Sequence, residues 1–480
     1  MKKIAFAALL FAGALSAQAA ITLPAIISDN MVLEQNTEVR LWGKGNPGEK
    51  VTVTSSWNDA PVTAVTGQNG RWSLYFPTSQ ASSKENTLTF KGDNNTVVVS
   101  NILLGEVWLC TGQSNMQYPV GEHKDKFRWM TGMYDSEEVL KEAYNPEIRL
   151  FKVPYNLQPT TVFDDCEGSW VIATPRTVTE FSAIGYLFGK QLNQELKLPV
   201  GLILAAKGDT HVESWLRKEV MTNNPFYNDV YAEFGVQNKK NNRPHKIPSG
   251  LWNGMIHPIL GYTVKGNIFY QGCANDQRFE KYQQAFTDLI YDWRKQWNQL
   301  DMPFYFVQIA PYRTMSPGIR EQQLKTLKSG LKNLEMVVTT DVGDSLDIHP
   351  RNKKVPAERL ARIALAKLYG KDITYSGPIY RDAEFKGKKV IINFDHTEGG
   401  LKTSDGEPLK GFFIAGENQK FYPAKAEIVG KTVVVSSPEV RKPVAVRYGF
   451  DYFFRVNLAN GDGLPASPFR TDSWKITKDR

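Results

Sequence analysis

The middle of the chain, from about residue 101 to residue 370, alternates short apolar runs with longer amphipathic segments. The apolar runs predict buried strands at residues 106–110, 200–206, 266–270, 304–309 and 335–339. The amphipathic segments predict helices, among them residues 181–195, 278–296 and 356–368. Such alternation is typical of a parallel sheet with helices on both faces, the α/β class. In these sheets the reacting groups lie on loops past the carboxyl ends of the strands.

Short alternating strands, separated by Gly, Pro, Asn and Asp, lie on both sides of this region. They are predicted at residues 37–42, 50–55 and 71–76, and again at 389–393, 425–429, 432–436 and 444–448. The chain of 480 residues is long enough for about two to four domains. We therefore expect an amino-terminal β module at 21–100, an α/β domain at 101–373 and a second β module at 374–480.

The first twenty residues differ from the rest of the chain. Lys2 and Lys3 precede an apolar run at 4–15, and Ala17-Gln18-Ala19 follows it. This pattern is typical of a signal peptide, so we expect residues 1–20 to be removed on export to the periplasm or extracellular space of a bacterium. This apolar run is too short to span a bilayer, and no other run in the chain is long enough. Three cysteines, Cys110, Cys166 and Cys273, can form at most one disulfide, and buried thiols are the simpler expectation.

The basic surplus of the chain does not indicate a nucleic-acid partner. The 58 Lys and Arg exceed the 50 Asp and Glu by eight, but they form no long basic tract. The segment 43–48 matches GxGxxG, yet a strand-like sequence follows it where a dinucleotide site requires a helix, so we expect a hairpin turn. His211 and Glu213 are spaced like half a metal site, but no second half accompanies them. We expect no metal or organic cofactor.

Ser114 is the first candidate for chemistry. It follows the predicted strand 106–110 in the sequence Thr111-Gly112-Gln113-Ser114, and a serine on a tight turn at the end of a strand can be exposed as a nucleophile. Residue 116 is Met rather than Gly, so the nucleophile elbow of α/β-hydrolases is absent. By itself, a serine in a turn is more often structural.

A nucleophilic serine requires a base, and among six histidines His349 has the most suitable context. It follows a predicted strand and precedes a predicted helix, and Asp347 two residues earlier could orient the imidazole. His257 lies in an apolar run and is expected in the core. His123, His245 and His396 have polar neighbours and are expected at the surface.

Two further loops at predicted strand ends contain donors suited to an oxyanion. Gly208 follows the strand 200–206 and offers an open backbone N–H, while Asn275 follows the strand 266–270 and offers a side-chain amide. Each of these loops taken alone is more simply a turn.

Together, Ser114, Gly208, Asn275 and His349 resemble the Ser-Gly-Asn-His (SGNH) hydrolases in order and position. The surrounding sequences, and sequences in both flanks, resemble the sialate O-acetylesterase family over nearly the whole mature chain. The strings that carry this resemblance include Gly105-Glu106-Val107-Trp108, Gly112-Gln113-Ser114-Asn115-Met116, Glu213-Ser214-Trp215, Asn253-Gly254-Met255-Ile256, Tyr270-Gln271-Gly272, Ile348-His349-Pro350-Arg351-Asn352-Lys353 and Pro468-Phe469-Arg470-Thr471-Asp472.

The resemblance implies a three-layer α/β/α domain between β-sandwich-like modules, and a serine esterase that removes acetyl groups from sugar hydroxyls without a cofactor. It implies that Ser114 is the nucleophile, His349 the base and Asp347 its acidic partner. The oxyanion hole would consist of Ser114, Gly208 and Asn275. The residues that the resemblance implies in substrate binding are Gln113, Trp215, Gln271 and Arg351.

The chain departs from the expected pattern at two positions. The wider superfamily has its acidic residue three positions before the histidine, where this chain has Leu346, so Asp347 is preferred and Asp344 is the alternative. Members of the closer family commonly have Glu after Tyr-Gln-Gly, and this chain has Cys273 there.

The family favours O-acetylated sialic acids as substrates. A sialate is anionic and requires a cationic partner, for which Arg313, Arg351 and Lys207 lie on suitable loops. Acetylated xylan or xyloglucan is the alternative, because a neutral glycan could bind on aromatic side chains such as Trp215. A non-catalytic glycan-binding protein is a weaker alternative, since all four motif residues are present. The sequence does not predict an oligomeric state.

Overall fold

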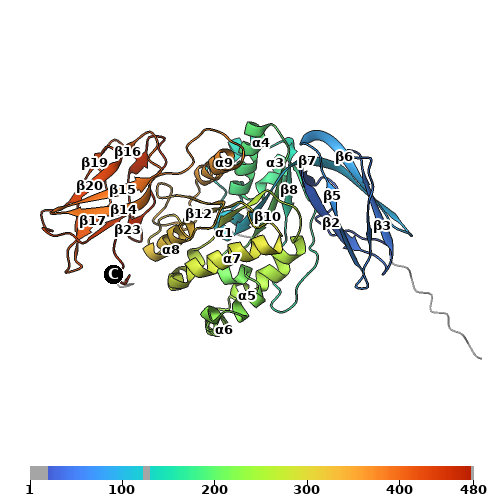
Figure 1. Ribbon diagram of the computed structural model, residues 1–480, viewed down its shortest axis with the longest axis horizontal. Coiled ribbons are helices and arrows are strands. Elements are labelled where there is room, and N and C mark those ends of the chain that lie inside the picture. Colours follow the sequence, from blue (N-terminus) through green and yellow to red (C-terminus); the bar gives the residue numbers. More distant parts are fainter. Residues whose placement is uncertain (1–19, 123–129, 477–480) are drawn as a thin grey trace, which may run out of the picture.

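The computed structural model describes residues 20–122 and 130–476, so residues 1–19 of the expected signal peptide lie outside it. Figure 1 shows three parts in a row along the long axis of the molecule. Strands coloured blue lie at one end and strands coloured orange to red at the other, and the α/β part lies between them.

The central sheet has the strand order β13-β12-β11-β7-β10-β8-β9. The neighbours from β13 to β8 are all parallel, and β9 is antiparallel at the edge. The bounds are β7 Thr96–Gly112, β8 Asn145–Lys152, β9 Trp170–Ala173, β10 Val200–Ala206, β11 Gly266–Tyr270, β12 Phe304–Val307 and β13 Leu334–Val337. Gly112 pairs with both Ala206 and Tyr270, so β10, β7 and β11 end at one level and their following loops start together.

Helices cover both faces of this sheet, which gives the predicted three-layer α/β/α arrangement (Figure 1). On one face Phe188 of α4 packs against Trp108 of β7, with 5.0 Å between the ring centres. On the other, Phe286 of α7 stacks on Phe269 of β11 at 4.9 Å. The helices are α1 Ser114–Gln117, α2 Ser136–Lys141, α3 Pro175–Thr179, α4 Ala183–Leu196, α5 Lys218–Thr222, α6 Val230–Asn241, α7 Tyr282–Gln296, α8 Pro317–Leu327 and α9 Lys354–Leu368.

Several shorter turns connect these elements. The 3₁₀ segments are η1 Val212–Trp215, η2 Pro225–Tyr227, η3 Pro244–Lys246, η5 His257–Ile259 and η6 Cys273–Lys281, and η4 Trp252–Ile256 is a π turn.

The amino-terminal β part is continuous with the central sheet through β7. The first half of this 17-residue strand pairs antiparallel with β6, and its second half lies between β10 and β11. The expected domain boundary near residue 100 therefore falls inside one strand. The other strands are β1 Val32–Glu34, β2 Glu38–Lys44, β3 Lys50–Ser55, β4 Val62–Val65, β5 Arg71–Pro77 and β6 Ser82–Lys91.

The carboxyl-terminal β part contains two four-stranded antiparallel sheets and one two-stranded sheet. Its strands are β14 Ile379–Lys386, β15 Lys389–Asp395, β16 Leu401–Thr403, β17 Phe412–Ala415, β18 Phe421–Pro423, β19 Lys425–Val429, β20 Thr432–Ser436, β21 Ala445–Tyr448, β22 Leu458–Asn460 and β23 Phe469–Arg470. Arg470 of β23 forms a two-pronged ion pair with Glu321 of α8, at 2.8 and 3.0 Å, and so joins this part to the α/β layer.

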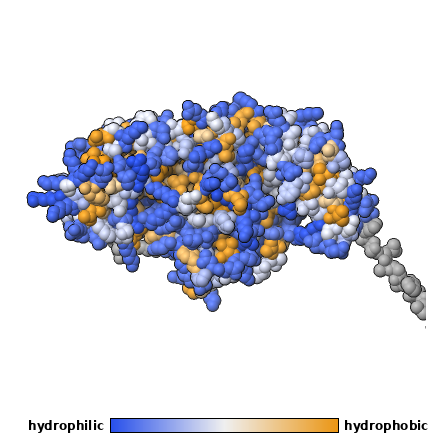
Figure 2. Space-filling model, viewed as in Figure 1, coloured by the Kyte–Doolittle hydropathy of each residue, from blue (hydrophilic) through white to orange (hydrophobic). Residues whose placement is uncertain are grey.

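One local expectation is wrong, and one strand of the central sheet is not predicted. The segment 43–48 is not a hairpin turn, because β2 pairs with β5 while β3 pairs with β4 and β6, so it connects two different sheets. The unpredicted strand is β8, which lies between β10 and the edge strand β9. Figure 2 shows a mainly hydrophilic face with small, separate hydrophobic patches. Among the described residues, no helix has the length and apolar character needed to cross a membrane.

Candidate active site

The turn between β7 and α1 is built on a glycine that no other residue can replace without strain. Gly112 has a φ of 133°, and a Cβ on it would lie 2.3 Å from the carbonyl oxygen of Tyr270. This close approach places the next N–H, of Gln113, 2.9 Å from the same oxygen. The chain then turns into α1, whose first residue is Ser114, at the carboxyl edge of the sheet.

His349 meets Ser114 at this edge. The imidazole Nε2 lies 2.8 Å from the Ser114 Oγ, although 235 positions separate the two residues. Ser114 is only 6% exposed, and the ring of Tyr118 from the end of α1 stacks near the imidazole at 6.3 Å. The structure therefore brings together the serine and the histidine that the sequence singled out as a pair.

The carboxylate beside the imidazole belongs to Asp347. Its Oδ1 accepts the backbone N–H of His349 at 2.8 Å and lies 3.6 Å from Nδ1 of the ring. The Asp347 side chain is 47% exposed. Asp344, the alternative, accepts the backbone N–H of Leu346 at 2.7 Å and so closes the turn before the histidine.

The environment of the imidazole favours its neutral form. Burial lowers the pKa of His349 from its ordinary 6.5 to about 4, and the nearby charge of Lys353 acts in the same direction. At neutral pH the ring can therefore accept a proton, as a general base must.

Gly208 lies directly against the serine. A Cβ on Gly208 would be 3.2 Å from the Ser114 Cβ, so its backbone follows the serine closely. Its N–H donates to Oε1 of Gln117 at 2.8 Å. The side-chain carbonyl of Gln117 in α1 therefore accepts the hydrogen bond of the predicted oxyanion donor, a contact that the sequence does not indicate.

Asn275 is held by a buried network at the start of η6. Its Nδ2 donates to Glu213 at 2.9 Å, and its Oδ1 accepts from Gln271 at 2.8 Å and from the N–H of Val212 at 3.0 Å. Glu213 in turn pairs with Arg278 at 2.5 Å. A primary amide has two N–H donors, and Glu213 takes one of them.

A cavity of about 470 Å³ opens beside the serine. Its lining residues are Gln113, Ser114, Gln117, Lys207, Gly208, Asp209, Arg243, His245, Cys273, Ala274, Ile348 and His349. Burial raises the pKa of Cys273 to about 12, so this side chain is a neutral thiol in the cavity wall. All three cysteines are free in this structure.

One wall of the cavity comes from a segment that the sequence analysis passed over. Asp209 forms ion pairs with Arg243 and with Lys246 and accepts a contact from His245 at 3.2 Å. His245, expected at the surface, is partly buried in this wall, with 18% of its side chain exposed. Nothing in the local sequence around 243–246 indicates this placement, because it depends on pairing across 36 positions with Asp209.

The predicted substrate-binding residues divide into three groups. Gln113 lines the cavity, where its Oε1 accepts the N–H of Gly272 at 2.8 Å. Trp215 and Gln271 are completely buried, and both donate to Thr210. Neither is among the residues that line the cavity.

The third group comprises cations. Arg351 donates to the carbonyl of Gly132 at 2.9 Å and lies over the ring of Tyr134, so it faces the segment 131–134. Arg313 is exposed and, like Arg351, is not among the lining residues. Lys207 does line the cavity, with its Nζ 4.4 Å from the ring centre of Tyr155.

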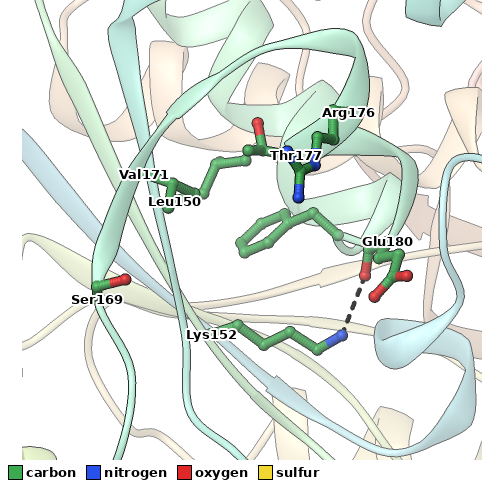
Figure 3. A pocket seen from close by; sticks show the side chains of 8 residues that line it. Leu150, Lys152, Ser169, Val171, Arg176, Thr177 and Glu180 are labelled. Carbon is green, nitrogen blue, oxygen red and sulfur yellow. Dashed lines mark hydrogen bonds between the residues drawn. The ribbon is translucent and has the colours of Figure 1, made fainter.

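A second cavity, of about 350 Å³, lies between β8, β9 and α3 (Figure 3). Its lining includes Ser169, Lys152 and Glu180, and the Lys152 Nζ donates to the Glu180 carbonyl at 3.2 Å. It contains no histidine and shares no residue with the cavity at Ser114. Within residues 20–122 and 130–476, no group of three or more His, Cys, Asp or Glu side chains is arranged to hold a metal ion.

Comparisons with known proteins now identify the family. The family model described as "Carbohydrate esterase, sialic acid-specific acetylesterase" matches residues 104–366, which include the serine, the histidine and every loop of the cavity. The chain belongs to this family. The resemblance seen in the sequence is thereby confirmed, and the protein is a carbohydrate esterase.

Individual relatives agree over nearly the whole chain. The sialate O-acetylesterase of Mus musculus is 27% identical, and the alignment covers 92% of this chain and 93% of the mouse protein. The sialate O-acetylesterase of Homo sapiens is 28% identical, and the alignment covers 92% of this chain and 91% of the human protein. A crystal structure of a carbohydrate acetylesterase from Xanthomonas citri superimposes with a TM-score of 0.84 at 32% identity. The superposition covers 95% of this chain and 100% of the Xanthomonas citri chain, so the likeness extends over both flanking β parts.

Proposed function

We propose that this protein is an exported serine esterase that removes O-acetyl groups from sialic acids through an acetyl-enzyme. The observation that carries the proposal is the 2.8 Å contact between Ser114 Oγ and a neutral His349 imidazole, at the edge of a cavity of about 470 Å³. That volume is in the range of cavities that enclose a small ligand.

In the proposed reaction His349 Nε2 takes the proton of Ser114 as Oγ attacks the acetyl carbonyl carbon. The tetrahedral intermediate collapses, the bond to the sugar oxygen breaks, and the imidazolium returns the proton to that oxygen. Water, deprotonated by the same imidazole, then attacks the acetyl-enzyme, and acetate leaves as the proton returns to Oγ. Asp347 orients the ring and stabilises its charged form.

The oxyanion is stabilised by the N–H groups of Ser114 and Gly208 and by the amide of Asn275. Because Gly208 now donates to Gln117, the substrate oxygen must displace the Gln117 Oε1 to use this donor. In the free enzyme the Gln117 amide oxygen accepts the N–H of Gly208, so this N–H is not left without a partner. The oxyanion bond is then charge-assisted and stronger than the one it replaces.

Lys207 and Arg243 are the groups that favour an anionic sugar. Both line the cavity that contains Ser114. Lys207 can bind a carboxylate there, whereas Arg243 would first have to give up its ion pair with Asp209. The aromatic side chain that the sequence offered for a neutral glycan, Trp215, is completely buried. These positions favour sialate over acetylated xylan or xyloglucan.

The test compares acetate release from O-acetylated sialic acid and from acetylated xylan. We expect the higher kcat/KM on the sialate. Lys207→Met should lower kcat/KM on the sialate by about tenfold to a hundredfold and change p-nitrophenyl acetate turnover little, because a charged hydrogen bond contributes about 1.5–3 kcal/mol. A higher kcat/KM on acetylated xylan than on the sialate would contradict the sialate assignment. So would a Lys207→Met variant that loses as much activity on p-nitrophenyl acetate as on the sialate.

We also propose that residues 1–20 direct export and are removed, and that the units 21–100, 101–373 and 374–480 form the domains of the mature protein. The basic start, apolar run and Ala17-Gln18-Ala19 support the first part. Amino-terminal sequencing of exported protein should begin near Ile21. A mature chain that still begins at Met1 would contradict export by cleavage.

A further inference from the structure

Lys353 is a buried cation close to the Ser114–His349 pair. It precedes α9 and is 1% exposed. Its Nζ donates to Oδ1 of Asn115 at 2.5 Å and lies 4.6 Å from the ring centre of Tyr118. Within the described residues its hydrogen-bond acceptor is thus a neutral amide, and its other neighbour is an aromatic face.

Such burial is costly, because an ammonium group loses its hydration without gaining a directly paired carboxylate. Lysines are among the residues least often fully buried, and perturbed ionisable groups are concentrated at functional sites. Lys353 therefore needs a local explanation. It is buried against Asn115 and Tyr118, which lie on and directly after the helix that begins with Ser114, so the explanation lies in the site itself.

The contacts of Lys353 connect the two segments that carry the pair. Asn115 follows Ser114 in α1, and its Nδ2 donates to the carbonyl of Ile348 at 3.1 Å. Ile348 directly precedes His349. The amide of Asn115 therefore bonds to the histidine loop on one side and to Lys353 on the other, while Tyr118 contacts both the lysine and the imidazole.

We propose that Lys353 is a positioning residue for this esterase, which fixes Asn115 and thereby holds the Ser114 helix against the His349 loop. The proposal rests on the proposed roles of Ser114 and His349. A displacement of about 1 Å between Ser114 and His349 can lower the rate by up to about a hundredfold. A rigid link between their two segments therefore preserves the rate.

The charge of Lys353 has a second effect on the same pair. Burial lowers the pKa of Lys353 from 10.5 to about 7, against the opposing influence of the Asp347 carboxylate. The charged amine helps to lower the pKa of His349. As the pH rises through about 7, Lys353 loses its charge and the imidazole becomes a stronger base.

The experiment measures kcat and KM for p-nitrophenyl acetate across pH in wild type, Lys353→Met and a matched control, Lys354→Met. Lys354 is the neighbouring lysine, but it is 37% exposed and pairs with Asp135. We expect Lys353→Met to lower kcat by tenfold to a hundredfold with less effect on KM. The acid limb of the kcat profile, which His349 sets, should move upward from about pH 4, because the charge of Lys353 is removed while the burial remains. The ionisation of Lys353 near pH 7 should disappear.

Asn115→Asp provides a second test that keeps the lysine. A carboxylate at this position would pair with the amine and raise the pKa of Lys353, so the ionisation near 7 should move to higher pH. This variant decides the question if Lys353→Met does not fold by circular dichroism. An ionisation that stays near 7 in Asn115→Asp would overturn the proposal.

Ser114→Ala separates this inference from the proposed function. If Ser114→Ala is inactive and Lys353→Met keeps the wild-type kcat and pH profile, the role of Lys353 is wrong and the esterase mechanism stands. If Lys354→Met reproduces the effects of Lys353→Met, the role is also wrong. Full activity in Ser114→Ala would contradict the mechanism, and the role of Lys353 with it.

Discussion

At the scale of single residues, the proposed chemistry depends on how Asp347 holds the imidazole. The carboxylate accepts the backbone N–H of His349 and lies 3.6 Å from Nδ1, while nearly half of its side chain is exposed. Water therefore screens it more than the buried aspartate of a classical triad. The contact orients the ring without burying a second charge in the cavity wall.

Asp347→Asn should therefore reduce kcat by about a hundredfold, less than the roughly 10⁴-fold seen where the triad aspartate is buried. Asp344→Asn serves as the matched control, because Asp344 closes the preceding turn through the N–H of Leu346 and an asparagine side chain keeps that bond. We expect a loss of less than about threefold there. A larger loss in Asp344→Asn than in Asp347→Asn, measured on p-nitrophenyl acetate, would reverse the assignment.

The sequence was sufficient to place Ser114 and His349 in one site because each follows a buried strand and each lies in a recognisable family motif. It could not place Gln117, Arg243 or His245. The position of Gln117 depends on a long-range contact with Gly208. The positions of Arg243 and His245 depend on long-range contacts with Asp209. The same limit explains why Trp215, a plausible sugar platform in the sequence, is a core residue in the structure.

At the scale of elements, the β7–α1 turn decides where the serine is presented. The turn requires the left-handed backbone of Gly112 and its close approach to β11. A side chain at this position would push apart two strands whose pairing sets the level of all three site loops.

Gly112→Ala should destabilise the protein by more than about 3 kcal/mol, because it combines a positive φ with a 2.3 Å clash against Tyr270. Gly235 in α6 is the control, since a Cβ there meets nothing within 4 Å. Gly235→Ala should raise the stability by about 0.5–1 kcal/mol through helix propensity. Denaturant unfolding measures both changes, and a neutral Gly112→Ala would show that the turn tolerates a side chain.

Elements were predicted best where a strand is buried and apolar. Residues 200–206 and 266–270 match β10 and β11 exactly in extent. The strand β8 was missed because it begins with polar residues and a proline and carries Arg149, which is buried by contacts with Asn30 and Asn101. The continuity of β7 through both sheets was also missed, because a sequence pattern does not show which partner a strand pairs with.

At the scale of the whole molecule, the amino-terminal part joins the α/β part through a buried charged cluster. Glu34 of β1 accepts the N–H of Val107, and Lys265 lies within 3.4 Å of Glu34 and 3.2 Å of Glu106. Tyr369, at the end of α9, donates to Glu106 at 2.6 Å. Two buried carboxylates share one lysine, so burial and the charge of Glu106 raise the pKa of Glu34 well above its ordinary 4.5.

This shift makes the stability of the junction dependent on pH. The folded state holds a proton on Glu34 more tightly than the unfolded chain does, so its contribution is complete below about 4.5 and is lost as the pH rises through the folded pKa. Glu34→Gln keeps the neutral form at every pH. Its stability relative to wild type should therefore increase as the pH rises from about 4.5 into the alkaline range, because only wild type has to give up the stabilising proton.

Thermal unfolding of both proteins across this range measures the effect, with Glu407→Gln as an exposed control that should show little change. A stability difference between Glu34→Gln and wild type that does not depend on pH would contradict the raised pKa.

The central claim is that Ser114 forms an acetyl-enzyme, and Ser114→Ala tests it most directly. Acetate release from O-acetylated sialic acid is measured for wild type and for this variant, with circular dichroism to confirm that both are folded. We predict that the folded variant loses at least about 10³-fold in kcat, since only oxyanion stabilisation and binding remain. A folded Ser114→Ala protein that releases acetate at the wild-type rate would contradict the claim.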